Sequence, residues 1–180
     1  MRVKQNHSNF REMLAGGHPN SLGKTIEVVD IILADNSRLE ELFNCYFSPD
    51  EVVRLRTSNA MKRICKVQRE WLIPYIDKLL SEVSQIEQAS AQWTLAQLFN
   101  QLGEFLSPKQ RKQAKKVLKT NLDAYSDWIV LNSTMDTLAK WSKSDPELKD
   151  WLKPYLAEIS LDKRKSVSNR ATKIIKQLNY

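Results

Sequence analysis

The side chains best suited to bind another molecule form three rows of polar residues that recur along the chain at nearly constant spacing. Guanidinium, ammonium and amide groups donate hydrogen bonds to acidic or hydrogen-bonding partners. The rows carry several basic residues, a single acid and no hydrophobic side chain, so they lack the aromatic anchors of a typical protein hot spot. The rows are Arg56, Thr94, Ser133 and Arg170; Asn59, Gln97, Asp136 and Lys173; and Arg63, Gln101, Lys140 and Gln177.

From these rows we predict a surface that binds an acidic or polar partner, with Trp93 supplying an aromatic edge one position away. An alternative is that the rows are a solvated helix face, which is the usual role of polar helix positions. The predicted binding residues are Arg56, Asn59, Arg63, Trp93, Gln97, Asp136, Lys140, Arg170 and Lys173.

Other kinds of site find little support in the sequence. His7 and His18 are the only histidines, and both precede the expected helical core, so neither a histidine metal site nor a Ser-His-Asp arrangement can sit there. Cys45 and Cys65, the only cysteines, make no disulfide framework, and we expect both to be reduced core residues. We therefore predict no catalytic residue, no metal ion and no cofactor.

Positive charge is concentrated in the C-terminal half of the chain. The formal net charge is +7, and residues 109–119 and 163–176 contain many lysines and arginines with almost no acids. Such a surface could hold a nucleic-acid backbone by counterion release, or steer an acidic protein toward it. A solubilising helix face is the more frequent role of such a run, and we interpret residues 109–119 in that way.

The elements that position these groups are helices in a repeating array. One apolar or small position recurs at Val53, Ala91, Val130 and Val167, with spacings of 38, 39 and 37 residues. Repeated helix pairs that cannot bury their own apolar faces must stack on their neighbours. Four further columns keep this spacing: Thr57, Leu95, Thr134 and Ala171; Ala60, Leu98, Thr137 and Ile174; Met61, Phe99, Leu138 and Ile175; and Ile64, Leu102, Trp141 and Leu178.

The apolar periodicity predicts alternating first and second helices after an N-terminal half repeat that begins near residue 22. First helices are expected at residues 39–47, 69–83, 109–122 and 146–159. Second helices are expected at residues 49–66, 86–102, 127–143 and 165–178. Ser48 and Pro49 predict an N-cap and a first helical position for the helix that carries the first column.

The stretch from Ser48 to Arg54, followed by Thr57, Ala60 and Met61, resembles the HEAT repeat. The similarity lies in an acidic turn, a Val-Arg pair and small and large apolar residues along the second helix. It covers about residues 20–180, although Gln92 and Leu131 replace the arginine of the Val-Arg pair in later repeats. The overall likeness is to small bacterial HEAT-repeat proteins without an assigned activity.

This resemblance implies an all-α, right-handed α-α superhelix, an armadillo-like solenoid of about four helix pairs plus the half repeat. It also implies that the second helices line a concave surface, where such proteins bind their partners. We therefore expect a non-enzymatic scaffold for a protein partner, with nucleic-acid binding as the alternative. HEAT-like glycosylases for alkylated bases make an enzyme a third possibility, with Asp136, Arg170 and Lys173 in suitable repeats, although Asn132 stands where an aromatic residue is required.

Composition bears on organisation and location. With 42% hydrophobic residues, four Gly and six Pro in 180 residues, the chain favours helices over a many-turned β fold. We expect a flexible N-terminal tail over residues 1–19 and a single domain over residues 20–180. No apolar run suits a membrane span or a signal peptide, which predicts a cytoplasmic protein without a membrane partner.

Overall fold

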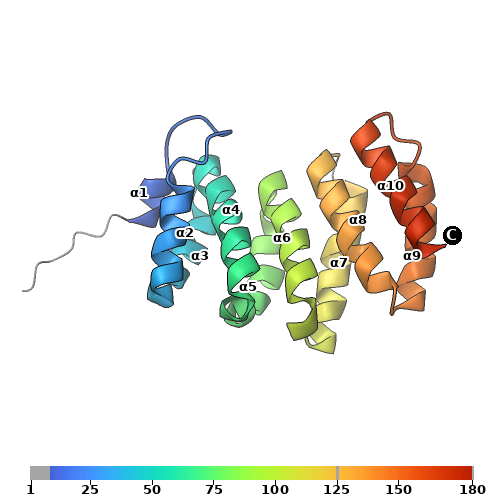
Figure 1. Cartoon of the computed structure of the whole chain (residues 1–180), viewed down its shortest axis with the longest axis horizontal. Coiled ribbons are helices and arrows are strands. Elements are labelled where there is room, and N and C mark those ends of the chain that lie inside the picture. Colours follow the sequence, from blue (N-terminus) through green and yellow to red (C-terminus); the bar gives the residue numbers. More distant parts are fainter. Residues whose placement is uncertain (1–8, 125, 180) are drawn as a thin grey trace, which may run out of the picture. The chain divides into compact units, whose positions relative to one another are not determined.

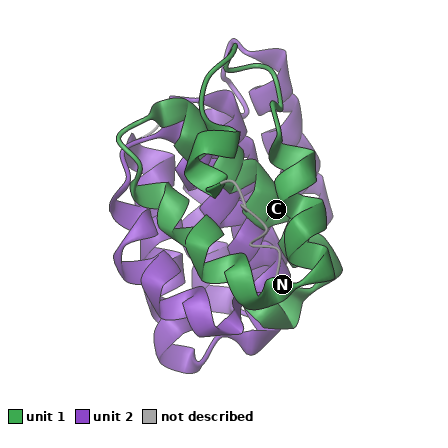
Figure 2. Cartoon of the chain, turned by 90° about the vertical axis from the view of Figure 1, so that its left-hand side faces the viewer, with its two compact units in different colours: residues 1–71 green, residues 72–180 purple. Residues whose placement is uncertain are grey.

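A computed structural model of the chain describes residues 9–124 and 126–179. Over these residues the protein is all-helical, with ten α-helices, short 3₁₀ turns and no β-strand, so the predicted all-α class is confirmed. Backbone contacts divide the chain into two compact units, Met1–Trp71 and Leu72–Tyr180 (Figure 2). The prediction that residues 20–180 form one domain stays a prediction.

Unit 1 is built around helix α4, against which the three preceding helices pack. Within the segment predicted as a tail, α1 is an ordered helix with Phe10 and Leu14 fully buried. Residues 1–8 of that segment, His7 included, lie outside the described residues. The helices are α1 (Phe10–Leu14), α2 (Thr25–Ala34), α3 (Leu39–Asn44) and α4 (Glu51–Val67).

Helix α4 begins at Glu51, two residues later than the predicted first helical residue, Pro49. Its N-cap is Asp50, which has an extended backbone and whose carboxylate accepts a hydrogen bond of 2.8 Å from the Val52 N–H. The Ser48 hydroxyl accepts from the Asp50 N–H instead, so Ser48 stabilises the turn that precedes the cap. The prediction of Ser48 as N-cap is therefore wrong, because the Asp50 carboxylate is placed to satisfy the first free amides of the helix.

Unit 2 has α8 at its centre. Helix α8 packs against α6, α7, α9 and α10, and α6, α8 and α10 lie side by side (Figure 1). Asp127 caps α8 by accepting hydrogen bonds from the Ile129 and Val130 N–H groups at 2.8 and 3.0 Å. The helices are α5 (Ile76–Ser81), α6 (Ala89–Leu102), α7 (Pro108–Ala124), α8 (Trp128–Ser142), α9 (Pro146–Ile159) and α10 (Lys165–Leu178).

The repeating columns are core positions within each unit, as their spacing predicts. Val53, Ala91, Val130 and Val167 are all fully buried. Every member of the other four columns is also buried except Ile175, which is partly exposed. Recurrence at 37 to 39 residues therefore does identify the buried stripe of α4, α6, α8 and α10.

The predicted helix over residues 69–83 is broken in the structure. Its first half is a 3₁₀ segment, Arg69–Tyr75, and the α-helical part is only Ile76–Ser81. Pro74 lies in this 3₁₀ segment, but proline alone does not break the helix, because Pro154 in the matching Trp-Leu-X-Pro-Tyr sequence lies inside the continuous helix α9. The result is a short α5 in place of a full-length first helix.

Both cysteines are free thiols buried in unit 1, which confirms their predicted role as reduced core residues. Burial raises the thiol pKa of Cys45 to about 11 and that of Cys65 to about 12. Because the thiolate is the nucleophile and the metal ligand, neither side chain is suited to that chemistry near neutral pH.

Candidate functional site

Hydrogen bonds between polar side chains connect α6 to α8 in unit 2. The Gln97 amide donates to the Ser133 hydroxyl at 3.0 Å, and one turn later the Asn100 amide donates to the Thr137 hydroxyl at 3.3 Å. The Thr137 hydroxyl in turn donates to the Ala96 carbonyl at 2.8 Å. These bonds hold the amide groups in fixed orientations, so any partner meets an organised set of donors and acceptors.

A shallow cavity of about 300 Å³ lies over this network. We call its lining the amide face, because amides and hydroxyls dominate it. Lys140 closes one edge, where its ammonium group donates to the Asn100 carbonyl at 2.9 Å and to the Asn100 side-chain oxygen at 3.0 Å. The residues of the amide face are Gln97, Asn100, Gln101, Ser133, Asp136 and Thr137.

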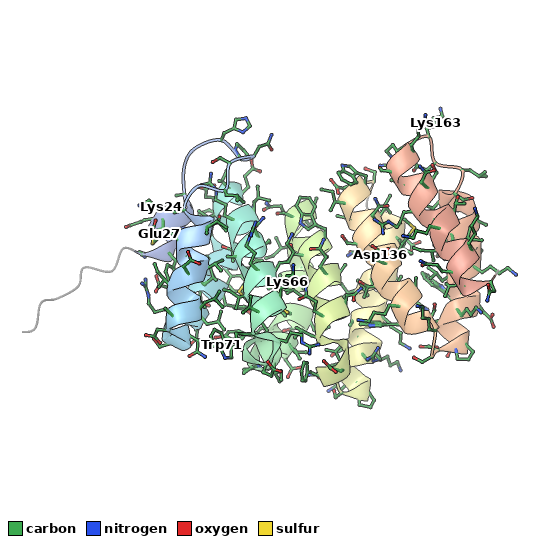
Figure 3. All side chains as sticks on the ribbon, viewed as in Figure 1. Lys24, Glu27, Lys66, Trp71, Asp136 and Lys163 are labelled. Atoms are coloured by element: carbon green, nitrogen blue, oxygen red, sulfur yellow. The ribbon has the colours of Figure 1, made fainter. Side chains whose placement is uncertain are left out.

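Asp136 is the single acid of the amide face and connects it to α10 (Figure 3). Its carboxylate forms an ion pair with the Arg170 guanidinium at 3.3 Å. Desolvation raises the Asp136 pKa above its ordinary value, and the nearby charges of Arg170 and Lys173 offset only part of that rise. Because both groups of the pair stay partly exposed, the pair contributes little stability.

Five of the six unit 2 members of the predicted binding set come together, all except Trp93. Gln97, Asp136 and Lys140 line or border the amide face, and Arg170 and Lys173 face it from α10. Trp93 is on α6 and is partly buried. Asn132, which stands at the position of the glycosylase aromatic residue, is buried and its amide donates to the Ser166 carbonyl at 3.5 Å.

Four cavity residues, Asn100, Gln101, Ser133 and Thr137, are absent from the predicted binding set, and of these Asn100 and Thr137 are also absent from the polar rows. Thr137 falls in an apolar column of the repeat and is buried, as that column predicts. Its hydroxyl nevertheless accepts a hydrogen bond from the Asn100 amide in the cavity lining. Asn100 is adjacent to Gln101 and follows two buried apolar residues, Leu98 and Phe99. Side-by-side amides at the end of an apolar stripe are the signal that identifies this edge of the cavity.

The remaining predicted residues belong to unit 1. Asn59 and Arg63 lie one turn apart on α4, and the Arg63 guanidinium donates to the Asn59 side-chain oxygen at 2.7 Å. Arg63 is exposed, as predicted for a surface residue.

Arg56 does not face solvent as the row pattern predicts. It is only 2% exposed, and its guanidinium is surrounded by backbone carbonyls of the segment that joins α1 to α2. This segment covers the polar side of α4, which the sequence alone does not place. We therefore correct the assignment: Arg56 organises unit 1 and presents no free group to a partner. Its acceptors are the carbonyls of Leu14, Ala15, Gly16, His18 and Ser21.

The buried guanidinium makes Gly23 the most constrained glycine of this segment. A Cβ at Gly23 would lie 2.8 Å from Cζ of Arg56, whereas a Cβ at Gly16 meets nothing within 4 Å. Both glycines have positive φ, at +50° and +72°, so an alanine is strained at either position. We expect Gly23→Ala to destabilise the protein by about 1 kcal/mol more than Gly16→Ala in urea denaturation. Equal losses would show that Arg56 moves aside without cost.

Comparison with protein-family models, with curated proteins and with solved structures finds no match to this chain. Over the described residues, no helix is both long and apolar enough to cross a membrane. Over the residues that the structure describes, the protein is all-helical and has an organised polar cavity on α6 and α8.

Proposed function

We propose that this chain is a HEAT-like α-solenoid that acts as a non-enzymatic interaction scaffold, and that it binds a polar or acidic segment of a protein partner at the amide face. The repeated columns support the solenoid, because α6, α8 and α10 bury equivalent positions at nearly constant spacing. The side chains of the amide face indicate which kind of segment it recognises.

The observation that carries the proposal is the organised polar cavity with cations at its edges. Carboxamide side chains carry both a donor and an acceptor, as a peptide backbone does, so the two can pair with each other. Lys140, Lys173 and Arg170 add positive charge around the cavity, which favours acidic side chains in the bound segment. Because the site holds few apolar groups, we expect moderate affinity with marked charge selectivity.

Affinity capture with a charge-reversed variant tests this proposal. The variant Lys140→Glu, Arg170→Glu, Lys173→Glu removes the cations around the amide face. A matched control, Lys143→Glu, Lys163→Glu, Lys165→Glu, makes the same charge change at exposed residues of unit 2 outside that cavity. We expect discrete proteins, recovered from cell lysate in the presence of nuclease, to disappear with the first variant and persist with the control. Equal recovery from both variants would overturn the proposal.

Nucleic-acid binding is the second candidate, favoured by the cation-rich sequence of α7. A complex that depends on phosphate contacts weakens steeply and log-linearly as salt rises. Recovery that is lost with nuclease and falls steeply between low and high salt would therefore replace the protein partner with nucleic acid.

The raised pKa of Asp136 gives a pH-dependent prediction. The folded state holds the proton more tightly than the unfolded state, so this group makes the free energy of unfolding fall as pH rises above the ordinary aspartate value. Asp136→Asn removes that contribution. We expect the stability difference, variant minus wild type, to increase in thermal melts between about pH 4 and pH 6. A decrease over this range would mean that attraction by Arg170 outweighs desolvation.

A further inference from the structure

A second surface of unit 2 is a groove lined mainly by α7 and by the start of α9. Both helices pack on α8, and the groove has a volume of about 890 Å³. Helix α7 contributes Lys112, Lys115, Lys116 and Lys119, while α9 contributes the exposed Glu147 and the buried Leu148. The lysine run that the sequence suggests as a solubilising face therefore borders a concave surface.

Several cations of α7 already have partners within unit 2. The Arg111 guanidinium lies 4.7 Å from the centre of the Trp141 ring, and the Lys119 ammonium lies 4.2 Å from that of Trp151. Lys115 forms an ion pair with Asp145 at 2.8 Å. These contacts fix part of the α7 side chains, so the groove is shaped before any ligand arrives.

The contact between Lys115 and Asp145 also ties the groove to the start of α9. The other carboxylate oxygen of Asp145 accepts from the Leu148 N–H at 3.0 Å and so caps that helix. The Lys115 contact and the backbone contact lower the Asp145 pKa, which keeps the carboxylate charged and the connection intact at neutral pH.

Lys112 and Lys116 differ from these neighbours. Both are exposed, both line the groove, and neither forms an ion pair within the described part of the chain. They lie one helical turn apart, so two ammonium groups project from the same side of α7. Placing two unpaired like charges at this spacing costs some helix stability, and an anionic ligand removes that cost.

We propose that this α7–α9 groove is a second docking surface, and that it binds an acidic peptide segment carrying an apolar side chain. Carboxylates of the peptide pair with Lys112 and Lys116. The apolar side chain packs along the lysine stems and toward Leu148 at the base of the groove. This surface is distinct from the amide face.

The groove suits a peptide better than a nucleic acid. Asp123 and Glu147 also line it, and their charges repel an anion at that end of the groove. A peptide can place uncharged residues beside these carboxylates and its acidic residues beside Lys112 and Lys116, whereas a nucleic acid carries a phosphate at every step. Single-stranded nucleic acids stack their bases on aromatic rings. Here the Trp151 ring is already stacked on Tyr155, with centroids 4.3 Å apart, and contacts Lys119.

Fluorescence anisotropy of the full chain with defined probes tests this inference. The first probe is a labelled dodecapeptide of repeated Glu-Glu-Leu, the second replaces its leucines with serine, and the third is an oligothymidylate of matched charge. We expect Lys112→Glu, Lys116→Glu to weaken binding of the first probe at least about tenfold. The matched control Lys163→Glu, Lys165→Glu should change it less than about twofold, and the serine probe should bind about tenfold more weakly than the leucine probe.

Each outcome of these titrations either supports the proposed groove or overturns it. Equal weakening by both variants would indicate long-range charge attraction and would overturn the groove. Tighter binding of the oligothymidylate than of the leucine probe would assign the groove to nucleic acid, and absence of peptide binding would also overturn the proposal. The uncharged variant Lys112→Gln, Lys116→Gln should lose affinity too, which excludes a fold defect from charge reversal. Because the amide face also favours acidic segments, the titrations are repeated in the Lys140→Glu, Arg170→Glu, Lys173→Glu background, where the effect of Lys112→Glu, Lys116→Glu should persist.

Discussion

Replacing Arg56 with alanine is expected to lower the free energy of unfolding by about 2 to 4 kcal/mol. The guanidinium donates to the Leu14 carbonyl at 2.7 Å, the Gly16 carbonyl at 2.6 Å and the Ser21 carbonyl at 3.1 Å. Hydrogen bonds from a charged donor are stronger than those from a neutral donor. Removing the guanidinium leaves several backbone carbonyls beside a cavity and without their hydrogen-bond donor. The segment between α1 and α2 should then lose its attachment to α4.

Urea denaturation followed by circular dichroism measures this loss, and limited proteolysis locates it. Arg56→Lys is the informative comparison, because it keeps the charge but cannot reproduce the planar set of donors. We expect Arg56→Lys to remain clearly destabilised, and both variants to be cleaved faster than the wild type between residues 14 and 24. If Arg56→Ala lowered the free energy of unfolding by less than about 0.5 kcal/mol, the hydrogen bonds from Arg56 to the backbone carbonyls would contribute no stability.

Met61→Ala is expected to have an effect of similar or larger size, about 2 to 5 kcal/mol. Met61 belongs to one of the repeating columns and is fully buried on α4. Truncation removes apolar contact area and leaves a cavity that a packed core fills only in part.

Lys66→Ala provides the matched control for Met61→Ala, because Lys66 is exposed on the same helix. We expect this control to change the free energy of unfolding by less than about 0.5 kcal/mol. Both substitutions leave a good helix former in place, so their difference reports core packing alone. Similar losses for the two variants would contradict the assignment of the Met61 column to the core.

The sequence predicts the helices with the longest apolar periodicity best. Helices α9 and α10 have the predicted bounds, and α6 and α8 differ only by a few residues at their ends. The reason is that a stripe of buried residues such as that of α8, from Val130 to Trp141, leaves a clear pattern of its own. Short elements such as α5 lack that pattern, and the first half of the predicted helix forms a 3₁₀ segment there instead.

The candidate site is predicted less completely, because burial of a polar residue depends on distant segments. Arg56 belongs to a row of polar residues, yet residues from a separate part of unit 1 cover it. Thr137 shows the converse, since a core position also supplies a hydroxyl to the cavity. Periodicity identifies which side of a helix is apolar, but it contains no information about which loop crosses the polar side.

Site-specific photo-crosslinking tests the proposed role of the amide face most directly. A benzoylphenylalanine at Gln101 places the reactive group in the cavity lining, whereas one at the exposed Lys143 places it outside that lining on the same unit. With nuclease present, we expect Gln101 to yield a discrete crosslinked protein band and Lys143 to yield none. The band should vanish in the Lys140→Glu, Arg170→Glu, Lys173→Glu variant. No crosslink at Gln101, or equal crosslinks at both positions, would contradict the claim that this face binds a protein partner.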